Sequence, residues 1–263
     1  MRLAAFIAMV AAPTAVQAQA SSGVTITFLA NEGVLLSSGT QKVLIDALYD
    51  PYKSYGIPHD STRRALRQAR PPFNDIDVVL VTHWHGDHFG SAPIADHLKA
   101  NSRAILVASD QVIDSLRRYA PAREIPPTRT LGRGVASGER RREVVNGVPI
   151  EVLGVTHGDG RHEDVQHRGF IVDIGERRVL HLGDTFFTEK EFSRLRLDTA
   201  RIDVALVPGW AVMENRAIIE RWIRPKQVVA IHLLNNELAR ALQIETAWPG
   251  AVAFTQSLHK RRW

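Results

Sequence analysis

The chain has 263 residues, of which 44% are hydrophobic. This is enough to bury a large core, and it excludes a disordered protein as the default. The chain contains no cysteine, which excludes disulfides, thiolate metal ligands and a cysteine nucleophile. Its net charge of +5 comes from dispersed arginines without the interleaved aromatic side chains of a nucleic-acid-binding stripe, so we expect no nucleic-acid partner.

The first twenty residues differ from the rest. Arg2 precedes a mostly apolar run to about Ala12, and the small-residue ending Ala18-Gln19-Ala20 follows. This pattern predicts a signal peptide over residues 1–20, cleavage near Ala20, and a periplasmic or secreted protein. The apolar run is too short to span a bilayer comfortably, although an uncleaved anchor is the alternative. After cleavage we expect no stable membrane insertion, and one domain over residues 21–263.

Three short apolar runs open this domain, at 24–29, 33–38 and 42–48. Their spacing of about ten residues predicts an antiparallel meander. Asp46 interrupts the third run, either as a solvent-facing residue or as a partner behind a metal-binding histidine. A short helix at 63–69 is then expected to stop before Pro71-Pro72.

The stretch 78–90, VVLVTHWHGDHFG, carries the densest chemical signal. The apolar run at 78–81 predicts a buried strand, and four side chains that can bind metal follow within six residues. Three histidines and a carboxylate at this spacing indicate a metal site rather than solvated or capping histidines. These four residues are His83, His85, Asp87 and His88.

Strands and helices alternate through the remainder of the chain. Helices are expected at 92–99, 110–119, 189–195, 213–223 and 235–242. Strands are expected at 104–108, 169–174, 178–182, 204–207, 227–231 and 252–254, with a hairpin at 143–155 about Asn146-Gly147. Both halves therefore begin with strands and then alternate strand and helix. This order predicts an α/β fold of two sheets packed face to face with helices outside.

Three further potential ligands each stand just past an apolar run: His157, Asp184 and His232. Alone, they would be a loop histidine, a turn residue and a core histidine. If their strands end at the same rim as the strand at 78–81, seven ligands converge there, and one carboxylate can bridge two ions. Two more histidines, His162 and His167, lie in the loop after His157 and are candidates for contact with substrate. No role is assigned to His59, His97, His181 and His259.

These motifs resemble those of the metallo-β-lactamase fold superfamily. THWHGDHFG is similar to its H-x-H-x-D-H motif, and His157, the LGDT of 182–185 and His232 match its later motifs in order. The resemblance implies an αββα sandwich of two mixed β-sheets with two divalent metal ions, most commonly Zn²⁺, with Mn²⁺ or Fe²⁺ as alternatives. It also implies that His83, His85 and His157 bind one ion, that Asp87, His88 and His232 bind the other, and that Asp184 bridges them. Asp87 would in addition be catalytic, orienting the attacking hydroxide.

The opening segment narrows the branch of the superfamily. It is similar to the ascorbate-phosphate-lactonase-like branch, and the carboxylate at Asp184 is shared with lactonases and glyoxalase II. The first branch usually carries a histidine where this chain has Ala30-Asn31-Glu32, a departure that speaks against a phosphosugar substrate.

The resemblance implies a hydrolase that cleaves an ester, lactone or related bond of a small molecule by means of a metal-bridging hydroxide, and the signal-peptide pattern predicts that it is exported. The alternatives are a β-lactamase or phosphodiesterase of the same fold and, in another class, a non-catalytic metal-binding module. The sequence does not indicate the oligomeric state.

Overall fold

The computed structural model describes residues 23–263 except 53, 159–161 and 236–237. The expected signal peptide at 1–20 lies outside these residues. No helix in the described part of the chain is long and apolar enough to cross a membrane.

The first sheet contains seven strands in the order β14-β1-β2-β3-β4-β5-β6. β1, β2 and β3 form the expected antiparallel meander, and β4, β5 and β6 continue from β3 in parallel. Its strands are β1 (Thr25–Ala30), β2 (Gly33–Ser38), β3 (Gln41–Ile45), β4 (Val78–Leu80), β5 (Ile105–Ala108), β6 (Thr130–Gly132) and β14 (Lys260–Arg262).

The second sheet repeats this plan in the order β7-β8-β9-β10-β11-β12-β13. β7 to β10 are antiparallel, and β10 to β13 are parallel. The repeated element order expected from the sequence is therefore present in the structure. The strands are β7 (Arg140–Val145), β8 (Val148–Val155), β9 (His167–Ile174), β10 (Arg177–His181), β11 (Val204–Pro208), β12 (Gln227–Ile231) and β13 (Val252–Ala253).

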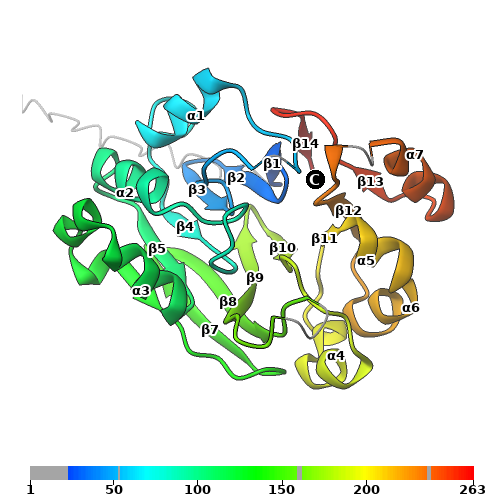
Figure 1. Ribbon diagram of the computed structural model, residues 1–263. Coiled ribbons are helices and arrows are strands. Elements are labelled where there is room, and N and C mark those ends of the chain that lie inside the picture. The colour runs from blue at the N-terminus through cyan, green and yellow to red at the C-terminus, as the bar shows by residue number, and fades with distance from the viewer. Residues whose placement is uncertain (1–22, 53, 159–161, 236–237) are drawn as a thin grey trace, which may run out of the picture.

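Helices cover the outer face of each sheet, α1 to α3 on one side of the molecule and α4 to α7 on the other (Figure 1). The expected αββα sandwich is confirmed. The helices are α1 (Asp60–Arg67), α2 (Ser91–Ala100), α3 (Asp110–Arg118), α4 (Glu189–Leu195), α5 (Gly209–Glu214), α6 (Arg216–Ile218) and α7 (Leu238–Ala247). Shorter turns are η1 (Ala120–Glu124), η2 (Pro127–Arg129), η3 (Leu197–Thr199) and the π-helical turn η4 (Ile219–Ile223).

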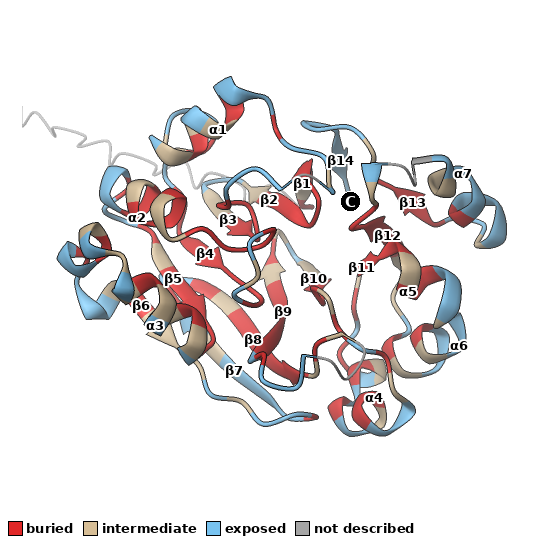
Figure 2. Cartoon of the chain, viewed as in Figure 1, coloured by how far each residue is buried: buried red, intermediate tan, exposed pale blue. Residues whose placement is uncertain are grey.

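Strand alternation divides the buried side chains into an inner and two outer layers. Figure 2 shows that the central strands of both sheets are buried. In β4, Val78 and Leu80 point between the sheets, whereas Val79 packs with the helices of the first half. In β11, Val204 and Leu206 likewise point inward. The central strands of both sheets are thus buried on two faces, whereas the edge strands β7 and β14 are largely exposed. This explains why the central strands appear in the sequence as continuous apolar runs.

One expectation about the elements was wrong in detail, and one strand was not expected. The run at 213–223 is not one helix, because the chain breaks at Asn215 between α5 and α6 and ends in the π-helical turn η4. The charged C-terminal residues 260–262 are exposed as expected, but they also form the edge strand β14 against β1. That pairing joins the two ends of the described chain, so no local pattern signals it.

Candidate metal centre

One rim of the sandwich collects the polar side chains that follow the strands. β4 leads into the loop that carries His83, His85, Asp87 and His88, and β12 leads into His232. The carboxyl ends of parallel strands meet at one edge of a sheet, which is where α/β proteins build their sites. Backbone hydrogen bonds join the halves at this rim: Arg168 N donates to Thr82 O at 2.9 Å, and His232 N donates to Asn31 O at 2.9 Å.

The first group of candidate ligands consists of His83, His85, His157 and Asp184, whose ligand atoms all lie within 4.8 Å of one another. His83 is fully buried and His157 is 5% exposed, whereas His85 is half-buried. The Nε2 atoms of His83 and His157 are 3.2 Å apart. Such close imidazole nitrogens fit ligands that share one ion.

The second group consists of Asp87, His88, His232 and Asp184, whose ligand atoms also lie within 4.8 Å of one another. Asp87 Oδ2 is 3.6 Å from His88 Nε2 and 3.7 Å from His232 Nε2. The structure therefore brings together all seven side chains that the sequence singled out as metal ligands, and it divides them into the two groups that the resemblance implies.

Asp184 belongs to both groups and presents a different oxygen to each. Its Oδ2 lies 3.6 Å from His157 Nε2 and 3.9 Å from His83 Nε2. Its Oδ1 lies 3.4 Å from His88 Nε2 and 3.0 Å from His232 Nε2. This is the arrangement that a carboxylate bridging two cations requires.

The arrangement of the donor atoms suits metal binding better than hydrogen bonding among the side chains themselves. His88 Nε2, His232 Nε2 and Asp184 Oδ1 are buried and have no hydrogen-bond partner among the described residues. His232 Nε2 and Asp184 Oδ1 are close, but they do not meet hydrogen-bond geometry. Unpaired buried polar atoms are costly, and cations between them would remove that cost.

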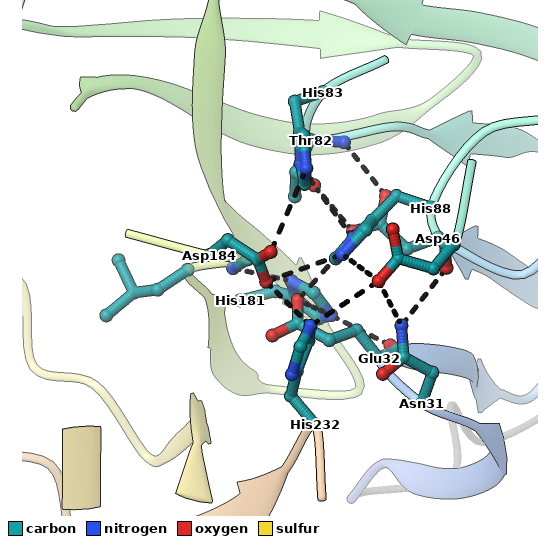
Figure 3. A network of polar contacts seen from close by, with 12 residues as sticks. Asn31, Glu32, Asp46, Thr82, His83, His88, His181, Asp184 and His232 are labelled. Atoms are coloured by element: carbon teal, nitrogen blue, oxygen red, sulfur yellow. Dashed lines mark hydrogen bonds and ion pairs between the residues drawn. The ribbon is translucent and has the colours of Figure 1, made fainter. Parts of the chain in front are cut away.

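A buried hydrogen-bond network supports the second group from behind (Figure 3). Asp46 Oδ2 lies 2.9 Å from His88 Nδ1, and Asp46 also accepts hydrogen bonds from Thr82 N at 2.8 Å and Thr82 Oγ1 at 2.6 Å. Of the two interpretations of Asp46, the structure supports the partner behind a histidine, because its side chain is fully buried. Such a carboxylate fixes the ring orientation and leaves Nε2 free for metal.

Asn31 and Glu32, in the turn between β1 and β2, were not expected at the site. Asn31 Nδ2 donates to Asp87 O at 3.1 Å and to Asp87 Oδ2 at 3.4 Å. The Glu32 carboxyl group is fully buried, has no hydrogen-bond partner among the described residues, and lies 3.9 Å from both His88 Nδ1 and His181 Nε2. In the sequence, these residues stood out because residues 30–32 differ from the ascorbate-phosphate-lactonase-like branch. The burial of this turn could not be predicted from the sequence, because polar turns are usually exposed.

Three residues of the site have an uncommon backbone conformation. Asn31, Asp46 and His232 have left-handed φ values of 52°, 44° and 56°. Such values are uncommon outside glycine and cluster at functional sites. Gly183, before Asp184, has φ of 57°, and a Cβ there would lie 2.5 Å from His167 Nε2, so the turn that presents Asp184 requires glycine.

The two groups differ in their protonation without metal. Burial lowers the pKa of His83 well below its ordinary value, and burial also lowers that of His85. Burial alone would lower the pKa of His232 too, but Asp184 and Asp87 raise it to about 10. The pKa of His88 is raised against burial by Asp184 and Asp46. Burial, reinforced by Asp184, raises the pKa of Glu32 and favours its neutral form.

The two candidate substrate contacts occupy different positions. His162 is exposed and lines a cleft of about 350 Å³ over the site, with its ring centroid 5.1 Å from that of His85. His167 is 1% exposed, and its ring lies 5.0 Å from His83, on the buried side of the first group. The contact of His162 with substrate stays a prediction, whereas the burial of His167 favours a role behind His83 and His157.

The comparisons with known proteins agree with this geometry. Residues 41–247 match a family model described as the β-lactamase superfamily domain. The chain belongs to the β-lactamase superfamily. A relative from Pyrococcus abyssi, named a UPF0173 metal-dependent hydrolase, is 30% identical over 80% of this chain and 84% of its own length.

Solved structures of the superfamily share the fold. Igni18, a metallo hydrolase from Ignicoccus hospitalis, superposes with a TM-score of 0.65 at 16% identity, covering 92% of this chain and 99% of Igni18. The metallo-β-lactamase fold protein YhfI from Bacillus subtilis gives 0.62 at 15% identity, covering 92% of this chain and 100% of YhfI. The superfamily expected from the sequence is therefore confirmed, with a candidate metal centre at the rim where its seven candidate ligands meet.

Proposed function

We propose that this superfamily member is a hydrolase with two divalent metal ions, and that it cleaves an ester, lactone or related bond of a small molecule. The observation that carries the proposal is Asp184, whose two oxygens face two separate groups of ligands. His83, His85 and His157 would hold one ion, and Asp87, His88 and His232 the other. The nitrogen-rich donor set favours Zn²⁺, and Mn²⁺ or Fe²⁺ also suit it.

When bound, such ions polarise the scissile group and lower the pKa of water, so that a nucleophile forms without serine or cysteine. The protein contributes orientation and a proton acceptor. Asn31 holds Asp87 from the side, and Asp87 Oδ2 points toward His88 and His232. Burial would raise the pKa of Asp87, but His232 and His88 hold it below its ordinary value. Asp87 is therefore ionised at neutral pH, so one of its oxygens could bind the ion while the other accepts a proton.

The cleft over the site supports a small-molecule substrate, because its volume is about 350 Å³ and it opens directly onto His157, Asp184 and His232. The ester or lactone assignment rests on Asp184, which occupies the place where thiolate-using β-lactamases carry cysteine. β-Lactam and phosphodiester hydrolysis remain the alternatives to test, as does metal binding without catalysis. The leader-like residues 1–20 support an exported protein, and we include export in the proposal.

A hydrolysis panel tests the function. Metal-free protein, zinc-loaded protein and manganese-loaded protein would be assayed on lactones, carboxylic esters, thioesters, β-lactams and phosphodiesters. We expect metal-dependent cleavage of the lactones, esters or thioesters. Cleavage confined to β-lactams or phosphodiesters would replace the substrate assignment. Two bound ions with no cleavage of any class would support the non-catalytic module.

Export has its own test. Expression of the full chain in a Gram-negative host, followed by fractionation and N-terminal sequencing, should give a periplasmic protein that begins near Ser21. An intact N-terminus in the cytoplasmic fraction would contradict export, and one in the membrane fraction would support the uncleaved anchor.

A further inference from the structure

Three aromatic side chains from separate segments line the cleft over the candidate metal centre. Tyr55 comes from the loop before α1, Phe186 follows Asp184, and Trp210 stands at the start of α5. They line the same cleft as His157 and Asp184, so a substrate bound there lies beside them.

The exposure of Phe186 does not result from lack of space in the core. Phe186 is 41% exposed, whereas its neighbour Phe187 is 5% exposed and stacks on Phe192 with ring centroids 4.8 Å apart. The chain thus buries one phenylalanine of the pair and presents the other to the cleft. A large apolar side chain left open at the mouth of a site indicates a contact for a ligand.

Packing holds two of the aromatic side chains in place before any substrate binds. Trp210 meets Phe187 edge-on, with ring centroids 6.2 Å apart and an angle of 90°. Tyr55 meets His232 at 4.4 Å and 69°. Fixed rings lose little conformational entropy when a ligand packs on them, so the contact retains most of its binding free energy.

The backbone of the third aromatic residue is tied to the segments that carry the metal ligands. Phe186 N donates to Thr156 O at 2.8 Å, and Gly158 N donates to Asp184 O at 3.0 Å. These bonds join the segment after Asp184 to the segment around His157. A group held beside Phe186 therefore lies next to the candidate centre, and its binding would position the bond to be cleaved.

We propose that the cleft binds substrates that carry a neutral aromatic ring beside the scissile bond, an inference that rests on the proposed hydrolase function. Three aromatic side chains can surround such a ring through offset or edge-to-face contacts, which a saturated ring of the same size cannot make. Glu214, which also lines the cleft, disfavours a ring that carries a carboxylate.

Matched pairs of esters test the preference. One pair is benzyl acetate and cyclohexylmethyl acetate, and the other is methyl phenylacetate and methyl cyclohexylacetate. Each pair keeps the reacting bond and the ring size. The ratio of kcat/KM within a pair would be divided by the ratio of the hydroxide-catalysed hydrolysis rates of the two esters, which corrects for their intrinsic reactivity. We expect the aromatic member of at least one pair to be favoured about fivefold or more. A corrected ratio near one for both pairs would overturn the proposal.

Substitutions locate the preference. Phe186→Leu and Trp210→Leu keep an apolar side chain but remove the ring, and we expect each to bring the ratio toward one. Trp222→Leu is the matched control. Trp222 is a half-buried tryptophan whose Nε1 donates a hydrogen bond to Glu189, and it is not among the residues that line the cleft. A ratio unchanged in both cleft variants, or lost equally in the control, would contradict the assignment to these side chains.

A binding experiment separates this inference from the proposed function. Saturation-transfer NMR would compare benzyl alcohol with cyclohexylmethanol, and it requires no hydrolysis. Selective binding of benzyl alcohol that weakens in Trp210→Leu, without hydrolysis of any ester, would support the aromatic site and refute the ester assignment of the proposed function. Equal hydrolysis within each pair, with equal binding of the two alcohols, would refute the aromatic site and leave the hydrolase standing.

Discussion

The two groups of candidate ligands share Asp184 but have different surroundings. Asp46 and Glu32 are fully buried behind the second group, and Asp46 contacts His88 directly. Behind the first group lies His167, whose pKa burial lowers well below its ordinary value and whose ring nitrogens have no hydrogen-bond partner among the described residues. The first group also reaches solvent through the half-buried His85.

This contrast indicates two ways of preparing a cation site. The second group has its histidine orientation and local charge set in advance by carboxylates. In the first group, burial instead holds the pKa values of His83 and His85 below the ordinary value, so that these two imidazoles are neutral before an ion binds. We therefore expect the groups to respond differently to mutation and pH, except at the residue that they share.

The largest effect is expected from Asp184→Ala. It removes the oxygens that face both groups, so both metal equivalents should be lost and activity should fall by about a thousandfold or more, on the order of 4 kcal/mol. Metal analysis and steady-state kinetics would measure this. Asp77→Ala is the control, because Asp77 is a buried carboxylate that accepts hydrogen bonds from Lys42 N and Arg103 Nε away from the site. Full activity in Asp184→Ala would show that the bridge is misassigned.

Asp46→Asn should separate the two groups. Loss of a carboxylate behind a metal-binding histidine lowers metal affinity by roughly 10–100-fold. We expect that loss in the second group alone, seen as one weakened step in a two-step metal titration. Equal weakening of both steps, or of neither, would remove the distinction between the groups. Asp77→Asn again controls for the loss of a buried carboxylate.

The pH dependence should also differ between the groups. With a pKa of about 10, His232 is protonated at pH 7.5 without metal, so an ion entering the second group must displace a proton. The lowered pKa values of His83 and His85 leave them neutral there. Calorimetry in buffers of different ionisation enthalpy should therefore show proton release for the second group. Proton release on metal binding to the first group alone would contradict the predicted difference in protonation between the groups.

The raised pKa of His232 also makes the stability of the folded protein depend on pH. The folded pKa of His232 lies above its ordinary value of 6.5. Its contribution to stability is therefore fully present below pH 6.5 and is lost as the pH rises toward 10. Metal-free protein should unfold at lower temperature as the pH is raised across this window, whereas metal-loaded protein should change less.

Asn31→Ala should have a smaller effect. Removal of the donor to Asp87 should lower kcat by about threefold to tenfold, the equivalent of one hydrogen bond, with both ions retained. Asn31→Asp, which replaces the donor by a carboxylate beside Asp87, should lower kcat further, because the two like charges repel each other. If either variant lost the second ion, Asn31 would be required for metal binding rather than for positioning Asp87.

The smallest effect is expected from His162→Ala. Its exposed ring lines the cleft, so KM should rise by a few fold while the metal content stays at two equivalents. His59→Ala, an exposed histidine at the start of α1, provides the comparison. A loss of metal in His162→Ala would make this residue a ligand.

The sequence predicted the candidate ligands well, because each follows an apolar run that forms a strand. His232 illustrates this: the run at 227–231 identifies the buried strand β12, and parallel strands end at a common rim. Two halves with the same order of elements were sufficient to predict two packed sheets.

The surroundings of the ligands could not be predicted in the same way. Asn31 and Glu32 occupy a polar turn, and their burial depends on contacts with the second half of the chain, such as the bond from His232 N to Asn31 O. Asp46 was ambiguous for the same reason, since its partner His88 lies 42 residues away. Local periodicity reports which face of a strand is apolar, but it does not report what packs against a loop.

Anomalous diffraction from crystals of the zinc-loaded protein tests the central claim most directly. We predict two peaks about 3.5–4 Å apart, one among His83, His85 and His157, the other among Asp87, His88 and His232, with Asp184 between them. A single peak at full occupancy, or a second peak among Glu32, Asp46 and His181, would contradict the account.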